Sequence, residues 1–559
     1  MKKRILPVII AILLILVIAG GALGKVLLDK YSYSKEEADW NEFYQVSESD
    51  RSAIILQDEM VEEQALIRDD VCYFDLATVH KYMNEVFYAD MTEKLLLYAN
   101  PTEVIRTTFG ETSYTTTEGT QDAGYVISFV EGDTVYVAAD YVKLFTNYSY
   151  DCYDRHVQVY TEWGTRQVAQ LKKDTAVRLR GGVKSPILTQ AAKGDTLEIL
   201  EQMETWSKVK TADSVIGYVE NKRLGDITEE TETPVTDYQE PEYTALTSDS
   251  KICLGWHSIG GAGGNDTLYS MVSGTKGMNV IAPTWFMLTD NQGNYESLAD
   301  KNYVDRAHSM GLQVWAVLDN FNKGENVQSE ILFASMAARK KLIASLMQDA
   351  KTYGFDGINL DVEGIKASAG PHYVQFIREL SIDCRKEGLV LSIDSYVPAS
   401  YSAFYNWAEQ GRVADYVVMM GYDEHYAGGE AGSVASIGYE RQGIEDLLKQ
   451  VPKEKLISAI PFYTRIWKED ASGTTSQSLG IADAKAWVED NQVELYWQDD
   501  LGQYYGETQK DGVNYEIWME EERSLALKMQ LIRDNGLAGV ACWRLGLEPA
   551  DIWDTVKLP

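Results

Sequence analysis

"FDGINLDVE", residues 355–363, decides the fold class of the C-terminal part of this 559-residue chain. Apart from its carboxylates and Asn359, the run is apolar, which is typical of a strand buried in a parallel sheet. Seven similar apolar runs occur between residues 251 and 545, and amphipathic helical stretches separate most of them. Eight such units in about 300 residues predict an α/β fold, a (β/α)8 TIM barrel over residues 250–559.

The eight runs are short and are separated by polar or helical sequence, as parallel strands with covered faces require. They are KICLGWHS (251–258), NVIAPTWF (279–286), LQVWAVLD (312–319), FDGINLDVE (355–363), LVLSIDSY (389–396), DYVVMMGYD (415–423), KLISAIPFY (455–463) and LAGVACWRL (537–545). Between the last two runs, residues 467–519 are expected to form a small insertion over one rim of the barrel.

Active sites of TIM barrels lie at the C-terminal ends of the strands. In this chain those ends are rich in aromatic and acidic residues, with little positive charge: Trp256, His257, Trp285, Asp319, Asn320, Asp361, Glu363, Asp394, Tyr396, Tyr422, Asp423, Phe462, Tyr463, Trp543 and Arg544. Aromatic rings pack on the apolar faces of sugars, and carboxyl groups donate protons to a glycosidic oxygen. These residues therefore predict a carbohydrate site.

The run 355–363 also places several polar groups on a strand that is expected to be buried, and buried carboxylates are unfavourable unless they are paired or used. Strand alternation puts Asn359, Asp361 and Glu363 on one face, toward the inside of the barrel. Asp356 lies three residues before Asn359 and need not share that face.

This spacing, D-x-x-N-x-D-x-E, resembles the strand-four signature of glycoside hydrolase family 18, D-G-x-D-x-D-x-E. "MMGYDEHY" (419–426) resembles the strand-six motif of the family, and "GVACWRLG" (539–546) resembles its strand-eight tryptophan region. The resemblance covers residues 250–559. Within the family, "PTWFMLTDNQG", "IPFYTRIW" and "GLAGVACWRLGLEPADIW" look most like spore cortex-fragment-lytic enzymes and related cell-wall hydrolases.

The resemblance implies a retaining, substrate-assisted hydrolysis of bonds to N-acetylglucosamine, in which Glu363 is the general acid. Asp361 would orient the substrate acetamido group, and Tyr422 would donate a hydrogen bond to its carbonyl. The remaining residues are expected to bind substrate: Trp543 under the reacting sugar, Asp423 beside it, and Asp356, Asn359, Trp285, Asp394, Tyr396 and Trp256 around it. No cofactor or metal is implied.

Asn359 departs from the family pattern, where the middle residue is usually a second acid. Two close carboxylates cannot easily both ionise, so one of them normally keeps a raised pKa. With an amide at this position Asp361 has a neutral hydrogen-bonding neighbour in place of the second acid, whereas the general acid and the acetamido route are unaffected. The cortex-lytic branch often carries Asn here, so we do not interpret it as inactivation.

Upstream of the barrel we expect five further segments. Residues 1–25 form a cytoplasmic tip and a transmembrane anchor, residues 26–65 an acidic helical stalk, and residues 226–249 an acidic linker. Residues 66–163 form a small α+β domain that resembles the N-terminal repeat domain of copper amine oxidases, without copper or amine oxidation. Residues 164–225, with Trp206 and a closing "GYV", resemble a small bacterial Src-homology-3-like β-barrel.

The N-terminus supplies the localisation. After Lys2, Lys3 and Arg4, twenty residues carry no charge, which matches one bilayer crossing. The positive-inside rule then leaves residues 26–559 outside the cytoplasm, on a single-pass membrane protein. The alternative is a cleaved signal peptide that ends before Lys25 and yields a secreted protein.

Composition excludes some classes of partner. The formal net charge of −34 repels phosphate backbones, so nucleic acid is not expected as a partner. The five cysteines include no C-x-x-C pair and the six histidines are scattered, which argues against a metal site. A Cys72–Cys152 bridge is one option for an exported chain.

Four functions remain open from the sequence. The leading one is a membrane-anchored glycosidase of peptidoglycan in the cell wall, and the same-class alternative is hydrolysis of chitin or related oligosaccharides. The different-class alternatives are a non-catalytic, lectin-like surface protein and a scaffold in which the small domains carry the function. Lectin-like members typically lose the strand-four glutamate, and Glu363 is retained here.

Overall fold

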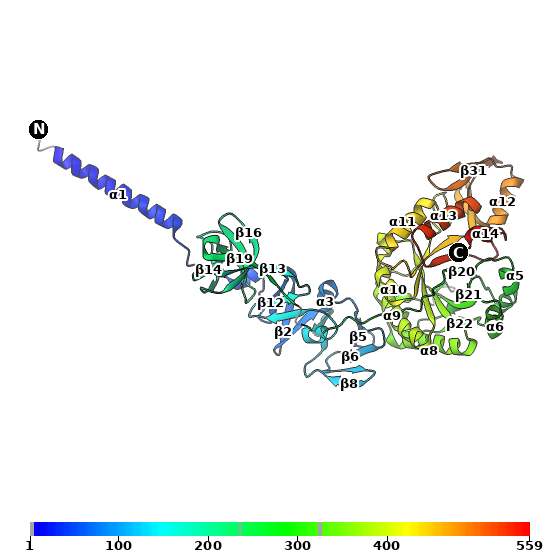
Figure 1. Cartoon of the computed structure of the whole chain (residues 1–559), viewed down its shortest axis with the longest axis horizontal. Coiled ribbons are helices and arrows are strands. Elements are labelled where there is room, and N and C mark those ends of the chain that lie inside the picture. The colour runs from blue at the N-terminus through cyan, green and yellow to red at the C-terminus, as the bar shows by residue number, and fades with distance from the viewer. Residues whose placement is uncertain (1–4, 234–235, 237, 322–326, 559) are drawn as a thin grey trace. The chain divides into compact units, whose positions relative to one another are not determined.

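The computed structural model describes residues 5–233, 236, 238–321 and 327–558 (Figure 1). The basic residues Lys2, Lys3 and Arg4 lie outside the described residues. Helix α1 spans Ile5–Tyr31, and an 18-residue window within Pro7–Tyr31 has a mean hydropathy of 2.7 with none of its residues buried. By length and composition this helix can cross a membrane, as a signal sequence also can.

The chain then divides into two compact units, each described separately below. The first unit contains a seven-stranded mixed sheet in the order β11-β12-β1-β2-β3-β10-β9, with helices α3 and α4. The bounds are β1 Arg51–Leu56, β2 Glu59–Arg68, β3 Val71–Asp75, α3 Leu76–Tyr82, β9 Ser128–Glu131, β10 Thr134–Ala138, α4 Ala139–Lys143, β11 Ser149–Cys152 and β12 His156–Tyr160.

The expected helical stalk is wrong from Arg51 onward, because β1 and β2 form a hairpin in this sheet. A short helix, α2 (Trp40–Tyr44), precedes the hairpin. Ala53, Ile54 and Ile55 are buried, and β1 pairs in parallel with β12. The α+β domain therefore begins at Arg51, about fifteen residues before the predicted boundary at residue 66.

The small β-barrel is a second seven-stranded sheet of the first unit, in the order β15-β14-β18-β17-β16-β13-β19. Its strands are β13 Thr165–Leu171, β14 Thr175–Arg178, β15 Ile187–Ala191, β16 Thr196–Gln202, β17 Trp206–Lys210, β18 Ile216–Glu220 and β19 Leu224–Thr231. The last strand extends past the predicted boundary at residue 225, because its acidic end pairs with β13 as far as Thr231.

The second unit comprises residues 88–106, 115–119 and 241–559, so part of the predicted α+β domain belongs with the barrel. This part includes β5 (Leu95–Ala99) and most of β4 (Phe87–Asp90) and β6 (Val104–Thr108), in a sheet that continues to β7 (Ser113–Thr116) and β8 (Gly119–Asp122). The carboxylate of Asp90 accepts the Met336 amide at 2.9 Å and lies 3.4 Å from Arg339, which also pairs with Glu379. All three ionic side chains are buried.

The predicted TIM barrel is confirmed, and all eight runs form its parallel strands. They are β20 Ile252–His257, β21 Val280–Leu288, β23 Gln313–Asp319, β24 Gly357–Asp361, β25 Val390–Tyr396, β26 Tyr416–Met420, β27 Leu456–Pro461 and β33 Gly539–Trp543. The barrel closes through the pairing of β20 with both β21 and β33. One short antiparallel strand, β22 (Tyr295–Ser297), extends the edge of β21.

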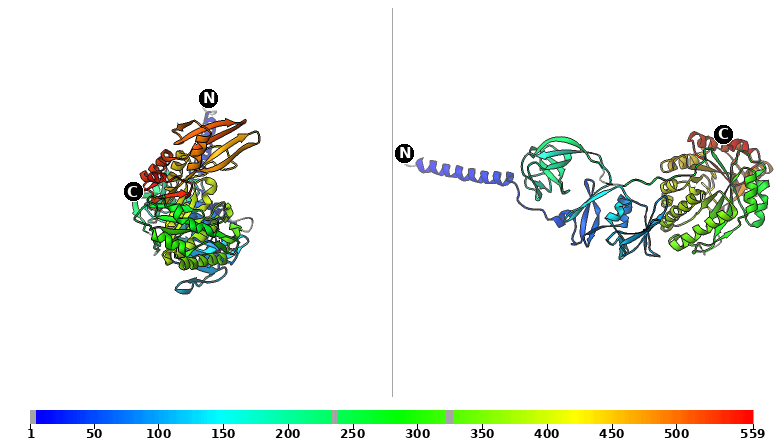
Figure 2. Two further views of the ribbon diagram at one scale, coloured as in Figure 1. Left: turned by 90° about the vertical axis from the view of Figure 1, so that its right-hand side faces the viewer. Right: turned by 60° about the horizontal axis from the view of Figure 1, so that its bottom comes forward.

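Helices surround the barrel strands, as Figures 1 and 2 show. They are α5 Leu268–Val272, α6 Lys301–Ser309, α7 Ser329–Leu332, α8 Met336–Tyr353, α9 Gly370–Glu387, α10 Trp407–Val413, α11 Ile437–Leu447, α13 Glu522–Asp534 and α14 Ile552–Val556. The local signals are clear for α8: the Ser335 hydroxyl caps its N-terminus, and Gly354 ends it with a φ of 79°.

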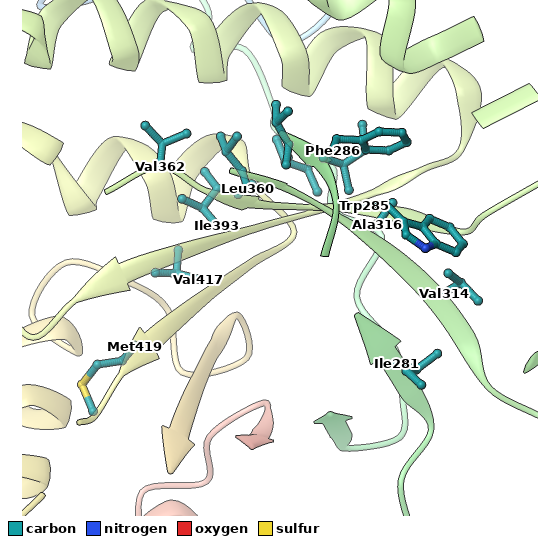
Figure 3. Close-up of a cluster of buried hydrophobic side chains, with 14 of the residues drawn as sticks. Ile281, Trp285, Phe286, Val314, Ala316, Leu360, Val362, Ile393, Val417 and Met419 are labelled. Carbon is teal, nitrogen blue, oxygen red and sulfur yellow. The ribbon is translucent and has the colours of Figure 1, made fainter. Parts of the chain in front are cut away.

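Strand alternation divides the apolar side chains into two cores. One lies between the strands and the helices and includes Ile281, Leu360, Val362, Ile393 and Met419 (Figure 3). The other fills the inside of the barrel. Since Leu360 and Val362 face the helices, the residues between and beside them must face the barrel interior.

The predicted insertion is present as a five-stranded antiparallel sheet in the order β29-β28-β32-β31-β30, with helix α12. Its elements are β28 Tyr463–Asp470, β29 Gly473–Gly480, α12 Ile481–Asp490, β30 Leu495–Gln498, β31 Gln503–Lys510 and β32 Val513–Met519. Strand β28 begins two residues after β27 ends, so the insertion continues directly from the mouth of the barrel.

Candidate active site

Strand β24 carries the central residues of the site. Asn359 and Asp361 point into the barrel and are buried, and Glu363 follows at the C-terminal mouth, partly exposed. Asp356 lies at the opposite end, just before the strand begins. Its carboxylate accepts the Val314 amide and faces His308, each at 2.8 Å. The expectation that Asp356 binds substrate is therefore wrong, because it joins the starts of two strands.

The backbone of Glu363 is held in place by a side chain on the neighbouring strand end. Its amide donates to Asn320 Oδ1 at 2.9 Å, and its carbonyl accepts from Asn320 Nδ2 at 2.7 Å. Tyr396 hydrogen-bonds to the Glu363 carboxyl, and its hydroxyl accepts from the Gly364 amide at 3.0 Å. Burial raises the pKa of Glu363, which favours the protonated form that a general acid needs.

Asp361 lies directly below Glu363 and hydrogen-bonds to it. Burial, with the nearby charges of Asp394, Glu363 and Asp319, raises the pKa of Asp361 well above its usual range. Its Oδ1 atom is buried and has no hydrogen-bond partner among the described residues. An unsatisfied buried acceptor is unfavourable by about 1–3 kcal/mol, so this atom is suited to accept a donor from a bound molecule.

Asn359 is the hub of a hydrogen-bond network below the two acids. Its Oδ1 accepts from Trp256 Nε1 at 2.8 Å, and its Nδ2 donates to Ser392 Oγ at 3.0 Å and to Asp394 Oδ1 at 2.7 Å. Burial raises the pKa of Asp394 well above its usual range, although the hydrogen bond from Asn359 acts in the opposite direction. The second buried acid of this site is therefore on β25.

These positions correct part of the predicted set of substrate contacts. Asn359, Trp256 and Asp394 are 0%, 1% and 3% exposed, so they support the mouth from below and do not line its surface. Trp285 is 0% exposed. It shares the helix-facing side of β21 with Ile281, packs against Tyr303 and donates to Asn265 at 2.8 Å (Figure 3). Trp285 is therefore a core residue.

The other wall of the mouth comes from the ends of β26, β27 and β33. Tyr422 is partly buried, and burial together with the charges of Asp361 and Asp394 raises its pKa well above the usual range, so the hydroxyl keeps its proton. Asp423 accepts a hydrogen bond from the Tyr463 hydroxyl at 2.6 Å. Trp543 packs edge-on against Trp256, with ring centroids 5.7 Å apart, and its own ring is partly exposed.

The structure brings to the site four residues to which sequence reasoning gave no catalytic or binding role. Asp319 and Asn320 end β23, and burial raises the pKa of Asp319 to about 6. Arg465 and Arg544 line a cavity of about 310 Å3 together with Asp423, Tyr463 and Trp543. Asp319, Asn320 and Arg544 belong to the strand ends that the sequence places at the mouth. Arg465 lies inside β28, where the strand pattern gives no signal.

Comparison with known proteins agrees with this geometry. Residues 324–548 match the family model described as glycosyl hydrolases family 18, and residues 173–225 match the one described as bacterial SH3 domain. The "Uncharacterized glycosylase YvbX" of Bacillus subtilis is 26% identical over 293 residues, which cover 50% of this chain and 84% of that protein. The cortical fragment-lytic enzyme of the same organism is 28% identical over 232 residues, covering 40% and 54%.

Solved structures share the fold of the barrel. A chitinase from Chromobacterium violaceum has a TM-score of 0.50 at 22% identity, covering 55% of this chain and 98% of that one. The spore cortex-lytic enzyme SleL of Bacillus cereus also has a TM-score of 0.50, at 19% identity, covering 57% and 75%. This chain thus spans most of YvbX but only about half of the cortical fragment-lytic enzyme.

Proposed function

Since the C-terminal barrel is a glycosyl hydrolase family 18 domain that follows a bacterial SH3 domain, we propose that this protein is a membrane-anchored, retaining glycosidase of peptidoglycan. It would hydrolyse β-linked N-acetylglucosamine bonds with assistance from the substrate. The observation that carries the proposal is the pair of acids at the end of β24: a partly exposed Glu363 hydrogen-bonds to a buried Asp361, one oxygen of which has no partner among the residues that the structure describes.

The proposed reaction begins with proton transfer. Glu363 gives its proton to the glycosidic oxygen while the substrate's 2-acetamido oxygen attacks C1, so the glycosidic bond breaks and an oxazolinium ion forms. Asp361 Oδ1 accepts the acetamido N–H and balances the positive charge, and Tyr422 donates to the acetamido oxygen. Water, deprotonated by the Glu363 carboxylate, then adds to C1 from the face that the leaving group left, which gives overall retention.

The Asn359 network suits this cycle. Asp361 needs to be ionised when the oxazolinium ion forms and can hold a proton at other times. Asp394, which accepts a 2.7 Å hydrogen bond from Asn359, is the additional buried acid that can retain a proton while Asp361 ionises. We therefore propose that Asp394 acts through Asp361: by keeping its own proton, it allows Asp361 to carry the negative charge.

Peptidoglycan is favoured over chitin as the substrate for three reasons. A relative that matches the barrel is named cortical fragment-lytic enzyme. The helix Ile5–Tyr31 would hold the site close to the outer face of a membrane, where the wall lies. The SH3 domain is of a bacterial type whose members often bind cell-wall peptides. Chitin oligosaccharides remain the same-class candidate, because chitinases share the fold.

The test is to incubate the full chain in detergent with purified peptidoglycan, with N-acetylglucosamine oligomers and with the same oligomers after de-acetylation. Mass spectrometry of the fragments and an assay of new reducing ends give the products. We expect cleavage of the acetylated glycans and no cleavage of the plain glucosamine oligomers. Equal turnover of both oligomers would contradict the oxazolinium route, and binding without any cleavage would favour the lectin-like alternative.

A further inference from the structure

A cavity of about 310 Å3 adjoins the proposed site for the reacting sugar. It is lined by residues from the ends of β26, β27 and β33 and from the inserted sheet: Asp423, Tyr463, Arg465, Ser478, Leu479, Gly480, Trp543, Arg544 and Leu547. Trp543 and Asp423 belong to both places, so a sugar on the exposed face of Trp543 would have this cavity as its neighbour. The volume is at the lower end of the usual range for ligand pockets.

Arg465 is incompletely satisfied in this cavity. Its side chain is 13% exposed, and its Nε is buried without a hydrogen-bond partner among the described residues. One terminal nitrogen donates to Ser476 Oγ at 3.3 Å, and another lies 3.7 Å from Asp423 Oδ1. The same Asp423 oxygen already accepts the Tyr463 hydroxyl at 2.6 Å. A guanidinium with a buried, unused N–H is suited to bind an additional acceptor.

Arg544 contributes a second positive charge. It follows Trp543, is partly exposed, and has no acidic partner within the part of the chain that the structure describes. The nearby Glu548 is engaged elsewhere, since its two oxygens accept from Trp553 Nε1 at 3.1 Å and from the Gly546 amide at 2.9 Å. Arg544 therefore presents a free guanidinium to the cavity.

The charge balance of the cavity differs from that of its surroundings. Asp319, Asp361, Glu363 and Asp394 concentrate carboxyl groups at and below the mouth, and the whole chain has a net charge of −34. The cavity wall instead holds two guanidinium groups against the single carboxylate of Asp423. An isolated cationic pair in such an acidic protein is not part of a general basic surface, and planar guanidinium groups bind carboxylates through paired hydrogen bonds.

We propose that Arg465 and Arg544 form an anion subsite, which binds a carboxylate carried on the sugar next to the reacting N-acetylglucosamine. In peptidoglycan that neighbour is muramic acid, whose 3-O-lactyl group ends in a carboxylate or continues into a peptide with its own carboxylates. Chitin has no such group. The inference rests on the proposed function and refines it, because it makes the neighbouring sugar's charge the feature that separates the two glycans.

The test compares four substrates with the full chain in detergent. Three share one backbone of alternating N-acetylglucosamine and muramic acid: peptide-free strands, the same strands coupled to methylamine so that the carboxylates become neutral amides, and strands that keep their peptides. The fourth is a neutral N-acetylglucosamine oligomer. The variants are Arg544→Gln and Arg544→Lys. The matched control is Arg533→Gln, an exposed arginine on α13 whose side chain donates to Gln530 of its own helix at 3.2 Å.

We expect the wild type to prefer carboxylate strands to methylamide strands by at least about tenfold in kcat/KM, mainly through KM. Arg544→Gln should reduce this ratio to near one, Arg544→Lys should keep part of it, and Arg533→Gln should keep all of it. If peptide-free strands are preferred to their methylamides, the bound group is the lactyl carboxylate. If only the peptide-bearing strands are preferred, the bound carboxylate is on the peptide. High salt should reduce the preference because it screens the charges.

Two outcomes overturn the anion subsite: a wild type that treats carboxylate and amide strands alike, or an Arg544→Gln variant that keeps the wild-type ratio. If the wild type cleaves none of the four substrates, the proposed function fails instead. The ratio is then measured as Kd values for the same strands by calorimetry, and equal Kd values for carboxylate and amide strands would also overturn the subsite.

Discussion

Asn359 Nδ2 donates a 2.7 Å hydrogen bond to Asp394 Oδ1, from β24 to the adjacent strand β25. The amide in the strand-four motif therefore does not remove the second acid of the site but connects the motif to an acid on the next strand. Because both residues are buried, the arrangement makes Asp394 a proton-holding group that is shielded from solvent.

The first prediction concerns pH and stability. Asp394 has a folded-state pKa above its unfolded value, so its contribution to stability is fully present below about pH 4 and is lost as pH rises through the raised pKa. Asp394→Asn keeps an oxygen for the Asn359 amide but does not titrate. We expect the Tm of this variant to fall less than that of the wild type between pH 5 and 8, as measured by calorimetry.

The same variant can also be tested by measuring the pH profile of its activity. Without the proton on Asp394, the pH profile of kcat/KM should change shape, because the coupled pair with Asp361 loses one titrating member. Asp415→Asn is a suitable control, since Asp415 is also a buried carboxyl with a raised pKa but lies at the other end of the barrel strands. An unchanged pH profile in Asp394→Asn would contradict the proposed positioning role.

The second prediction concerns the general acid. Glu363→Gln keeps the side-chain shape and the backbone hydrogen bonds to Asn320, but it cannot release a proton. General acid catalysis contributes about 10²–10⁴-fold, so the barrier should rise by about 3–5 kcal/mol at 1.36 kcal/mol per decade. Turnover of N-acetylglucosamine oligomers should fall accordingly, while Kd measured by calorimetry stays within a few-fold. Near-wild-type turnover would show that another group is the acid.

The third prediction concerns the buried network that joins residues 88–106 to the barrel helices. Arg339 is 0% exposed and serves both Asp90 and Glu379, so Arg339→Met leaves two buried carboxylates without their cation. Breaking a buried ion pair in this way lowers stability by about 3–5 kcal/mol. The barrel transition in calorimetry should shift to a lower Tm. The neighbouring exposed Lys340→Met is the control, and an equal shift in both would refute the assignment.

The fourth prediction concerns the anchor. An uncleaved helix over Ile5–Tyr31 should keep the chain with the membrane fraction after washing at high salt and high pH, since a span of this hydropathy is removed only by detergent. Protease added to intact cells should remove the barrel and leave an N-terminal tag protected. A soluble mature protein that starts near Lys25 would show instead that the segment is a cleaved signal.

The barrel could be predicted because each strand is a short apolar run, which can be recognised in the sequence without knowing which strands pair with it. The hairpin of β1 and β2 was missed because acidic and amide residues dominate 57–64, and because the pairing of β1 with β12 spans about a hundred residues. Trp285 was placed at the mouth because the strand is apolar on both faces, so composition did not reveal which side each residue takes. The link between Asn359 and Asp394 required the register of two strands.

The buried contact between Asp90 and Arg339 also determines where a stable expression fragment of this protein can begin. An expression fragment that starts at Lys251, the sequence-based edge of the barrel, would remove Asp90 and expose the surfaces of α8 and α9 that residues 88–106 cover. Such a truncation would leave Arg339 with Glu379 alone and add apolar area to water. A soluble fragment for crystallography should therefore begin after Tyr31 and keep the small domains, even when only the glycosidase is wanted.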